Sequence, residues 1–136
     1  MEEINSFLFV YGTLLDDSNE FAVYLKQHCN FYSKGKLSGR LYDLGEYPGA
    51  ILDENTDSYI HGSIVKLIDP NETLKRLDNY EGYGDDQDQP NLFLREIALV
   101  ETGNGAMNCW IYVYNFSVEG FRPIESGDYT DYKRNA

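Results

Sequence analysis

An uninterrupted run of apolar and aromatic residues, Phe7 to Tyr11, constrains the fold of this 136-residue chain more than any other feature. Such a run is typical of a strand buried on both faces, because a strand with one solvent face alternates apolar and polar residues. The run ends in Gly12-Thr13-Leu14, where a glycine lets the backbone turn and expose its N–H groups. We therefore expect a core strand that ends in a small polar loop able to bind a carboxylate or an oxyanion. The simpler alternative is a core strand followed by an ordinary turn.

A well-marked helix is predicted in the middle of the chain. Asp69 can cap its start, Pro70 suits its first position, and Glu72 completes a capping box with Asp69. Gly82 can end the helix in a left-handed conformation. The sequence therefore predicts a helix from about residue 70 to residue 81.

The rest of the chain predicts one more helix and about six strands. The helix is expected from about Ser18 to Cys29, followed by a break at Lys34-Gly35-Lys36. A Thr102–Gly105 segment with an Asn-Gly pair predicts a hairpin turn. Besides the first strand, strands are expected at Gly39–Leu44, Pro48–Leu52, Tyr59–Leu67, Leu92–Val100 and Met107–Tyr114.

These elements predict a single α+β domain over residues 1–136. Its sheet should be small, mixed or mainly antiparallel, and strongly curved or closed into a barrel, with two or more short helices. The segment from about residue 127 is polar and rich in tyrosine, and we expect it to lie over the surface as a tail.

Charge disfavours two classes of partner, and the N-terminus and the cysteines indicate the compartment. The net charge of −12 and the pI of about 4.4 disfavour nucleic acid and anionic membranes, because both are polyanions. The chain starts Met1-Glu2-Glu3, without the basic start of a signal peptide, and Cys29 and Cys109 form no C-x-x-C pair. We expect two buried thiols and a cytoplasmic protein.

Glu81, at the predicted end of the second helix, is the candidate general acid/base. It stands between Tyr80 and Gly82-Tyr83. Desolvation by aromatic rings would raise its pKa and make it a usable base and acid near neutral pH. The alternative is a solvated glutamate at a frayed helix end. Asp78, one turn earlier, is expected to cap the helix or to face solvent.

The other polar residues suggest little chemistry. His28 and His61 have no neighbours at metal-ligand spacing, so we predict neither a metal site nor a cofactor. Arg95 is expected to pair with an acidic group and to hold the helix end, and contact with the substrate is the alternative. The Gly84–Asn91 loop carries Asp85, Asp86 and Asp88, which would attract a cationic substrate or would simply be solvated.

Taken together, these segments resemble the small single-domain branch of the gamma-glutamylcyclotransferase-like family, which includes gamma-glutamylamine cyclotransferases and AIG2-like proteins. Each motif is weak alone, and their order and spacing carry the resemblance. Glu125 departs from the family, which commonly has proline there. The matching segments are Val10–Leu14, Gly39, Tyr42, Tyr47–Ala50, Leu77–Tyr83, Arg95, Trp110–Tyr114 and Ile124–Tyr129.

The resemblance implies an enzyme that closes 5-oxoproline from a small gamma-glutamyl substrate and releases a free amine, without metal or cofactor. It implies that Tyr11, Gly12, Thr13 and Leu14 hold the gamma-glutamyl group and that Glu81 is the catalytic acid/base. Pro48, Gly49, Tyr83 and Tyr114 are further candidates for lining the cavity. The alternatives are a non-catalytic module that binds a small carboxylate, and another gamma-glutamyl or acyl transfer reaction.

Overall fold

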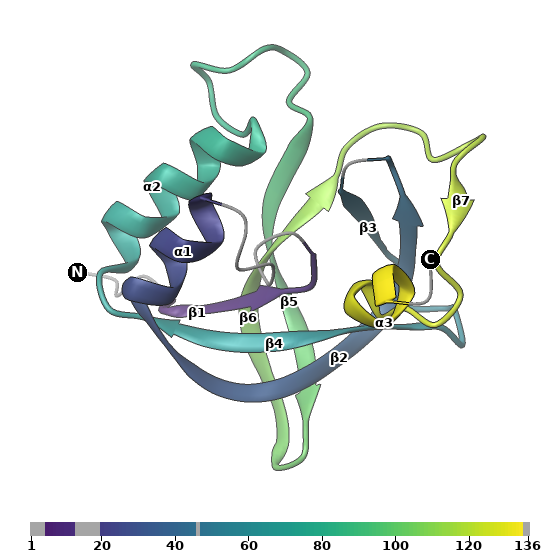
Figure 1. Ribbon diagram of the computed structural model, residues 1–136, viewed down its shortest axis with the longest axis horizontal. Helices are drawn as coiled ribbons and strands as arrows, with labels where there is room; N and C mark the ends of the chain where they lie inside the picture. Colours follow the sequence, from purple (N-terminus) through teal and green to yellow (C-terminus); the bar gives the residue numbers. More distant parts are fainter. Residues whose placement is uncertain (1–4, 13–19, 46, 135–136) are drawn as a thin grey trace.

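The computed structural model describes residues 5–12, 20–45 and 47–134, which form seven strands and three helices (Figure 1). The strands are β1 (Phe7–Val10), β2 (Cys29–Asp43), β3 (Pro48–Leu52), β4 (Tyr59–Leu67), β5 (Phe93–Thr102), β6 (Gly105–Tyr114) and β7 (Arg122–Pro123). The helices are α1 (Glu20–Gln27), α2 (Pro70–Glu81) and α3 (Tyr129–Arg134).

The strands form one strongly curved sheet in the order β3-β2-β4-β1-β6-β5, and β7 pairs with β2. The long strand β2 also reaches β5, where Lys36 pairs with Glu101, so the sheet closes into a barrel. β1 runs parallel to β6, and every other pairing is antiparallel. The predicted α+β fold with a mixed, strongly curved sheet is confirmed.

β1 is buried on both faces, as its composition predicts. Phe9 belongs to the core inside the barrel, whereas Leu8 and Val10 belong to a second core. That second core includes Leu74 and Leu77 of α2, and α1 and α2 lie on the same side of the barrel in Figure 1. A strand that lies between two apolar cores has no solvent face, which explains its uninterrupted apolar run.

The predicted break at Lys34-Gly35-Lys36 is wrong, because β2 continues through it from Cys29 to Asp43. A Cβ atom at Gly35 would lie 2.6 Å from Cγ1 of Val100 and 3.3 Å from the backbone oxygen of Glu101. The glycine therefore lets β2 pass close to β5 where the barrel closes. The first helix ends earlier than expected, at Gln27, because β2 already begins at Cys29.

α2 has the predicted ends. The Asp69 side chain accepts a hydrogen bond from the backbone N–H of Glu72 at 3.4 Å, and Pro70 is the first helical residue. Gly82 takes the left-handed conformation, with φ +76°, and Tyr83 N–H donates to the backbone oxygen of Asp78 at 2.9 Å. These caps set the position of Glu81 in the last turn of the helix.

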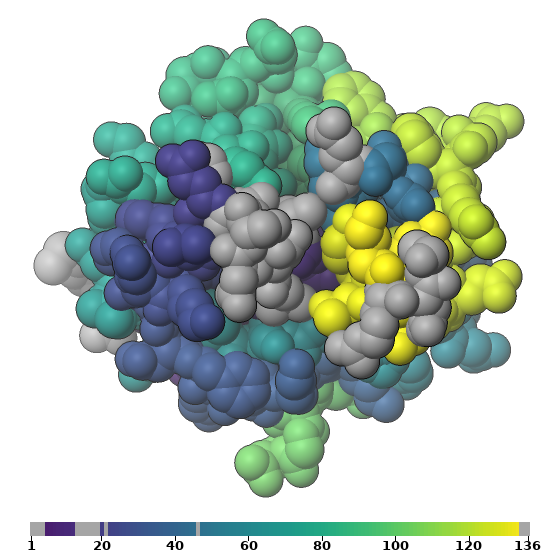
Figure 2. Space-filling view, in the orientation of Figure 1, coloured from purple at the N-terminus to yellow at the C-terminus, as the bar shows by residue number. Residues whose placement is uncertain are grey.

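The C-terminal segment is anchored in the fold as well as lying on the surface. Figure 2 shows this segment, in yellow, on the same face of the molecule as α1. Tyr129 is buried in the barrel core, and the Tyr132 hydroxyl donates to Oδ2 of Asp43 at 2.7 Å. Gly127 has φ +69° and lies so close to Tyr59 that a Cβ atom would collide with the backbone there. The polar composition of the segment from about residue 127 predicted a tail on the surface. The buried side chain of Tyr129 instead anchors this segment in the core.

Candidate active site

A cavity of about 270 Å³ opens where the end of β1, the start of β3, the end of α2 and the start of β5 meet. It brings together the strand end and the helix end that the sequence marks as candidate site segments. Most of its lining side chains are apolar or aromatic, and one carboxylate is among them. The lining residues are Phe9, Val10, Tyr11, Gly12, Tyr47, Pro48, Tyr80, Glu81, Leu92, Phe93 and Tyr112.

Two of the four predicted loop residues line this cavity. Tyr11 is buried, and its hydroxyl donates to the backbone oxygen of Tyr112. Gly12 lies against Pro48, and a Cβ atom at Gly12 would be 2.6 Å from Cγ of that proline. The absence of a side chain at residue 12 therefore lets the backbone lie this close to Pro48. Thr13 and Leu14 lie outside the described residues.

Glu81 is the last residue of α2 and contributes the carboxylate of the cavity. The residue is half-buried, and desolvation raises its pKa from 4.5 to about 7. No hydrogen bond or ion pair engages this carboxylate among residues 5–12, 20–45 and 47–134. A carboxylate with a pKa near neutrality can both accept and return a proton at physiological pH.

Two tyrosines next to Glu81 stay protonated. Burial raises the pKa of Tyr11 and of Tyr112 well above the usual range of a phenol, and the negative charge of Glu81 acts in the same direction. Both side chains line the cavity as neutral phenols. The carboxylate is thus the group near this end of the cavity that titrates around neutral pH.

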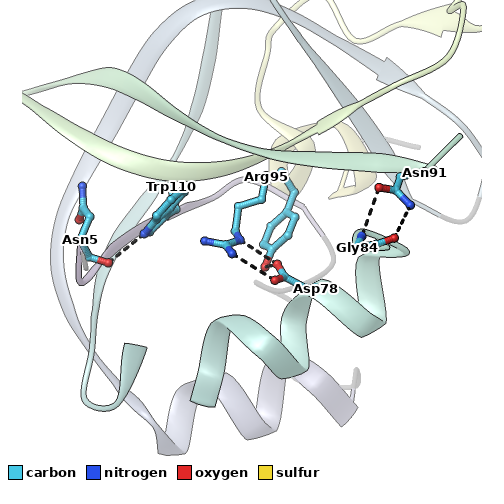
Figure 3. A network of polar contacts seen from close by, with 7 residues as sticks. Asn5, Asp78, Gly84, Asn91, Arg95 and Trp110 are labelled. Atoms are coloured by element: carbon cyan, nitrogen blue, oxygen red, sulfur yellow. Dashed lines mark hydrogen bonds and ion pairs between the residues drawn. The ribbon is translucent and has the colours of Figure 1, made fainter. Parts of the chain in front are cut away.

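An ion pair fixes the helix turn that precedes Glu81 (Figure 3). Arg95 donates from Nε to Oδ1 of Asp78 at 2.8 Å and from Nη2 to Oδ2 at 3.2 Å. The Tyr112 hydroxyl donates to the same Oδ1 at 2.8 Å, and the Arg95 guanidinium lies 4.3 Å from the ring centroid of Trp110. The expected pairing of Arg95 with an acid at the helix end is confirmed. The side chain of Asp78, expected to cap the helix or face solvent, instead joins α2 to β5 and β6.

Four further residues were expected to line the cavity. Pro48 lines it, and Gly49, Tyr83 and Tyr114 do not. Gly49 is packed tightly between Leu44 and Tyr114. A Cβ atom at this position would lie only 2.7 Å from Leu44 Cδ1. Tyr114 packs against the cavity residue Phe93, with ring centroids 5.6 Å apart. Tyr83 follows the helix end, with its ring 5.8 Å from the Arg95 guanidinium.

Sequence reasoning placed Tyr80 beside Glu81 but did not identify Tyr47, Phe93 and Tyr112 as aromatic residues of the cavity lining. One signal was available for Tyr112. It stands two residues before Tyr114 in the same strand, and alternate residues of a strand share a face. Which of several aromatic residues borders the cavity depends on how the barrel closes, and no local pattern contains that information.

The acidic loop reaches the cavity only through its neighbour Leu92. The Asn91 side chain holds the loop: its Oδ1 accepts from Gly84 N–H at 3.2 Å and its Nδ2 donates to the Gly84 oxygen at 2.9 Å (Figure 3). The three aspartates of the loop, Asp85, Asp86 and Asp88, are exposed and do not line the cavity. Any effect of their charges on a ligand would therefore act through solvent, over a distance.

The other candidate groups are the two cysteines and His61, which lines a separate hollow with Lys34 and Asp128. Cys109 is buried and Cys29 is half-buried, and His61 is an exposed strand residue. Within the described ranges, no group of three or more His, Cys, Asp or Glu side chains is placed to hold a metal ion. None of the helices in this part of the chain has the length and apolar character that crossing a membrane requires.

Comparison with known proteins gives consistent similarities. Residues 8–131 match the family model described as gamma-glutamyl cyclotransferase, AIG2-like. The chain is 37% identical, over 79% of its length, to the gamma-L-glutamyl-butirosin B gamma-glutamyl cyclotransferase of Niallia circulans, and the match spans 66% of that protein. It is 30% identical to the gamma-glutamylcyclotransferase family protein YtfP of Escherichia coli, over 91% of this chain and 96% of that protein. The crystal structure of YkqA from Bacillus subtilis superposes with a TM-score of 0.73 at 26% identity, covering 97% of this chain and 42% of YkqA.

Proposed function

This chain belongs to the gamma-glutamyl cyclotransferase, AIG2-like family, and from that membership and the cavity we propose that it is a gamma-glutamyl cyclotransferase. Its substrate would be a gamma-glutamylamine or a small gamma-glutamyl peptide, and its products would be 5-oxoproline and a free amine. The relative from Niallia circulans is named for such a reaction on gamma-L-glutamyl-butirosin B. The amine released by the present protein is part of the proposal.

The observation that carries the proposal is the position of Glu81 in a small, largely aromatic cavity. Desolvation there raises the pKa of the carboxyl to about 7. A largely desolvated acid that has no hydrogen-bond or ion-pair partner among the described residues destabilises a fold, so its presence is better explained by a proton-transfer role than by binding alone.

The reaction we propose is an intramolecular aminolysis. The alpha-amine nitrogen of the substrate attacks its own gamma-carbonyl carbon, the five-membered ring closes, and the bond from that carbon to the leaving nitrogen breaks. The Glu81 carboxylate takes a proton from the alpha-ammonium group, which frees the nucleophile. The resulting carboxylic acid then protonates the leaving nitrogen as its bond to carbon breaks. The ring nitrogen gives its second proton to the regenerated Glu81 carboxylate, which passes it to the released amine, so two protons are moved in turn and Glu81 returns to its starting state.

The cavity would also supply geometry and electrostatic stabilisation. An extended gamma-glutamyl group must fold so that its amine faces its carbonyl, and holding reacting groups in such a geometry is worth about 7–11 kcal/mol at best. Backbone N–H groups in the loop that follows Tyr11 are the candidate donors to the substrate carboxylate or to the developing oxyanion. The phenols of Tyr11 and Tyr112 stay protonated, so the Glu81 carboxylate is the group that changes charge near neutral pH beside them.

Incubation with a panel of gamma-glutamyl compounds tests the proposal against its two alternatives. A cyclotransferase releases 5-oxoproline and one equivalent of amine. A binding module on the same fold would bind gamma-glutamyl compounds or 5-oxoproline without turnover. Another acyl transfer would release amine while forming a new gamma-glutamyl product in place of 5-oxoproline. Chromatography of the products together with calorimetric titration separates the three.

A further inference from the structure

A row of aromatic side chains leads from the cavity to the protein surface along the end of β6. Tyr112 lines the cavity and is 3% exposed. Tyr114, two residues later, is half-buried, and Phe116 is 40% exposed. Exposure therefore increases outward along this row, with an aromatic residue at every second position.

Tyr114 makes the ring contacts that join the outer part of this row to the cavity residue Phe93. The centroid of Tyr114 lies 5.6 Å from that of the cavity residue Phe93 and 5.9 Å from that of Phe116. Phe121, which is 37% exposed, packs on Tyr114 from another side at 6.3 Å, with the two ring planes nearly perpendicular. Such edge-to-face contacts hold the rings in a defined arrangement.

Backbone hydrogen bonds place this row next to the mouth of the cavity. Asn115 N–H donates to the Leu92 oxygen at 3.0 Å, and its side chain donates to the Asn91 oxygen at 2.8 Å. Leu92 both lines the cavity and is 37% exposed, so the cavity meets solvent beside it. Phe116 follows Asn115 directly. Tyr114, Phe116 and Phe121 are joined by ring contacts, and with Leu92, whose backbone accepts a hydrogen bond from Asn115, they make up an apolar shelf beside the cavity.

The size of the cavity makes this shelf relevant to the substrate. At about 270 Å³ the cavity lies just below the range usual for drug-sized ligands, so it suits the gamma-glutamyl group rather than a whole conjugate. The remainder of a larger substrate must leave the cavity at the opening, where it meets the shelf. All four shelf side chains are uncharged, and exposed apolar patches beside a cavity are typical of ligand contact.

We propose that the shelf is the leaving-amine subsite and that it selects amines with an apolar, preferably aromatic, body. The inference rests on the proposed function, because it assumes that the gamma-glutamyl group occupies the cavity. Rings at the shelf would stack against the amine body, and each ring contact should contribute about a 2- to 10-fold preference. The charge of the amine is a separate variable, since the acidic loop acts only from a distance.

Two gamma-glutamylamines test the inference: the amine part of one carries an aromatic ring, and the amine part of the other carries only a methyl group. The kcat/KM for 5-oxoproline release is measured with gamma-glutamylbenzylamine and with gamma-glutamylmethylamine, in the wild type and in Phe116→Ala, Phe121→Ala and the double variant. We expect the wild type to prefer the benzyl compound by 10-fold or more and the double variant to lose most of that ratio. Phe31→Ala removes an exposed ring of β2 that does not line the cavity, and it should keep the ratio.

Equal kcat/KM values for both compounds in the wild type would contradict the proposal that the shelf is the leaving-amine subsite. A preference for the benzyl compound that remains in the double variant would contradict it as well. Binding separates this failure from failure of the proposed function. If no compound is turned over, Kd values for the same two ligands are measured by calorimetry in the wild type and in the double variant. A shelf-dependent Kd ratio would retain the subsite while rejecting the cyclotransferase, and an equal Kd for both ligands would reject the subsite.

Discussion

Arg95 neutralises Asp78 one helical turn before Glu81. Its Nε lies 2.8 Å from Oδ1 of Asp78, and the two side chains are only 17% and 18% exposed. Without this pairing, two carboxylates would stand on one face of the last turns of α2, and each would oppose the ionisation of the other. With it, the raised pKa of Glu81 has burial as its cause.

Arg95→Met should therefore change both stability and the pH profile. A partly buried carboxylate left without its cation costs about 3 kcal/mol, and its charge should shift the midpoint of the kcat/KM profile upward from pH 7. Denaturant unfolding and pH-dependent kinetics measure the two effects. The double variant Arg95→Met/Asp78→Asn should recover most of both, because the unpaired charge is gone. An unaltered profile in Arg95→Met would show that the ion pair has no influence on Glu81.

Glu81→Gln should leave the fold intact and abolish turnover. The amide is nearly isosteric but cannot shuttle a proton, so the rate should fall by about 10²- to 10⁴-fold. The release of 5-oxoproline and the thermal unfolding curve are measured together. Glu72→Gln, in the exposed first turn of the same helix, is the matched control and should keep near-wild-type activity. Near-normal turnover in a folded Glu81→Gln protein would remove Glu81 from the mechanism.

The protonation of Glu81 should make stability depend on pH. Because folding raises its pKa from 4.5 to about 7, the folded state binds the proton more tightly than the unfolded state does. Its contribution is therefore fully present below pH 4.5 and is lost as the pH rises through 7, a change of up to about 3 kcal/mol. We expect the unfolding free energy of the wild type, relative to Glu81→Gln, to fall across this window. A difference that is constant between pH 5 and pH 8 would contradict the burial of this carboxyl.

Gly12→Val should impair both the fold and the cavity. A side chain at this position would overlap Pro48 Cγ, since even a Cβ atom would lie 2.6 Å from it. We expect a loss of about 1–3 kcal/mol in stability and weaker binding of 5-oxoproline, measured by unfolding and by calorimetry. Gly103→Val is the control, because a Cβ atom at Gly103 would have nothing within 4 Å. Unchanged binding of 5-oxoproline in folded Gly12→Val would exclude this loop from the acyl site.

The acidic loop should affect the rate only for cationic substrates. Changing Asp85, Asp86 and Asp88 to asparagine removes three exposed charges beside the chain segment that carries Leu92. We expect kcat/KM for a lysine-derived gamma-glutamylamine to fall at low salt, and the difference to vanish at high salt, because the attraction is screened. A neutral gamma-glutamylamine serves as the reference. Identical kcat/KM values for wild type and triple variant at low salt would leave the loop without a substrate role.

Local signals were sufficient for the elements that lie closest to the site. The apolar run of β1 predicted a strand buried on both faces, and Asp69, Pro70 and Gly82 predicted the ends of α2. These predictions hold because capping and burial on both faces are expressed in adjacent residues. Glu81 could be named as the candidate acid/base for the same reason, since its aromatic neighbours and its place at the helix end are visible in the chain.

Closure of the barrel decided the rest. Gly35 reads as a break in the sequence, yet it is the point where β2 passes against Val100 of β5. The Tyr112 hydroxyl that binds Asp78 and the cavity rings of Phe93 and Tyr112 likewise come from strands far away along the chain. The sequence by itself determined β1, α2 and the segments of the candidate site, but not the full length of β2 or the helix α3 within the expected tail. The tertiary structure decided which side chains surround Glu81, because burial and pairing between distant strands depend on how the sheet curves and not on any neighbouring residue.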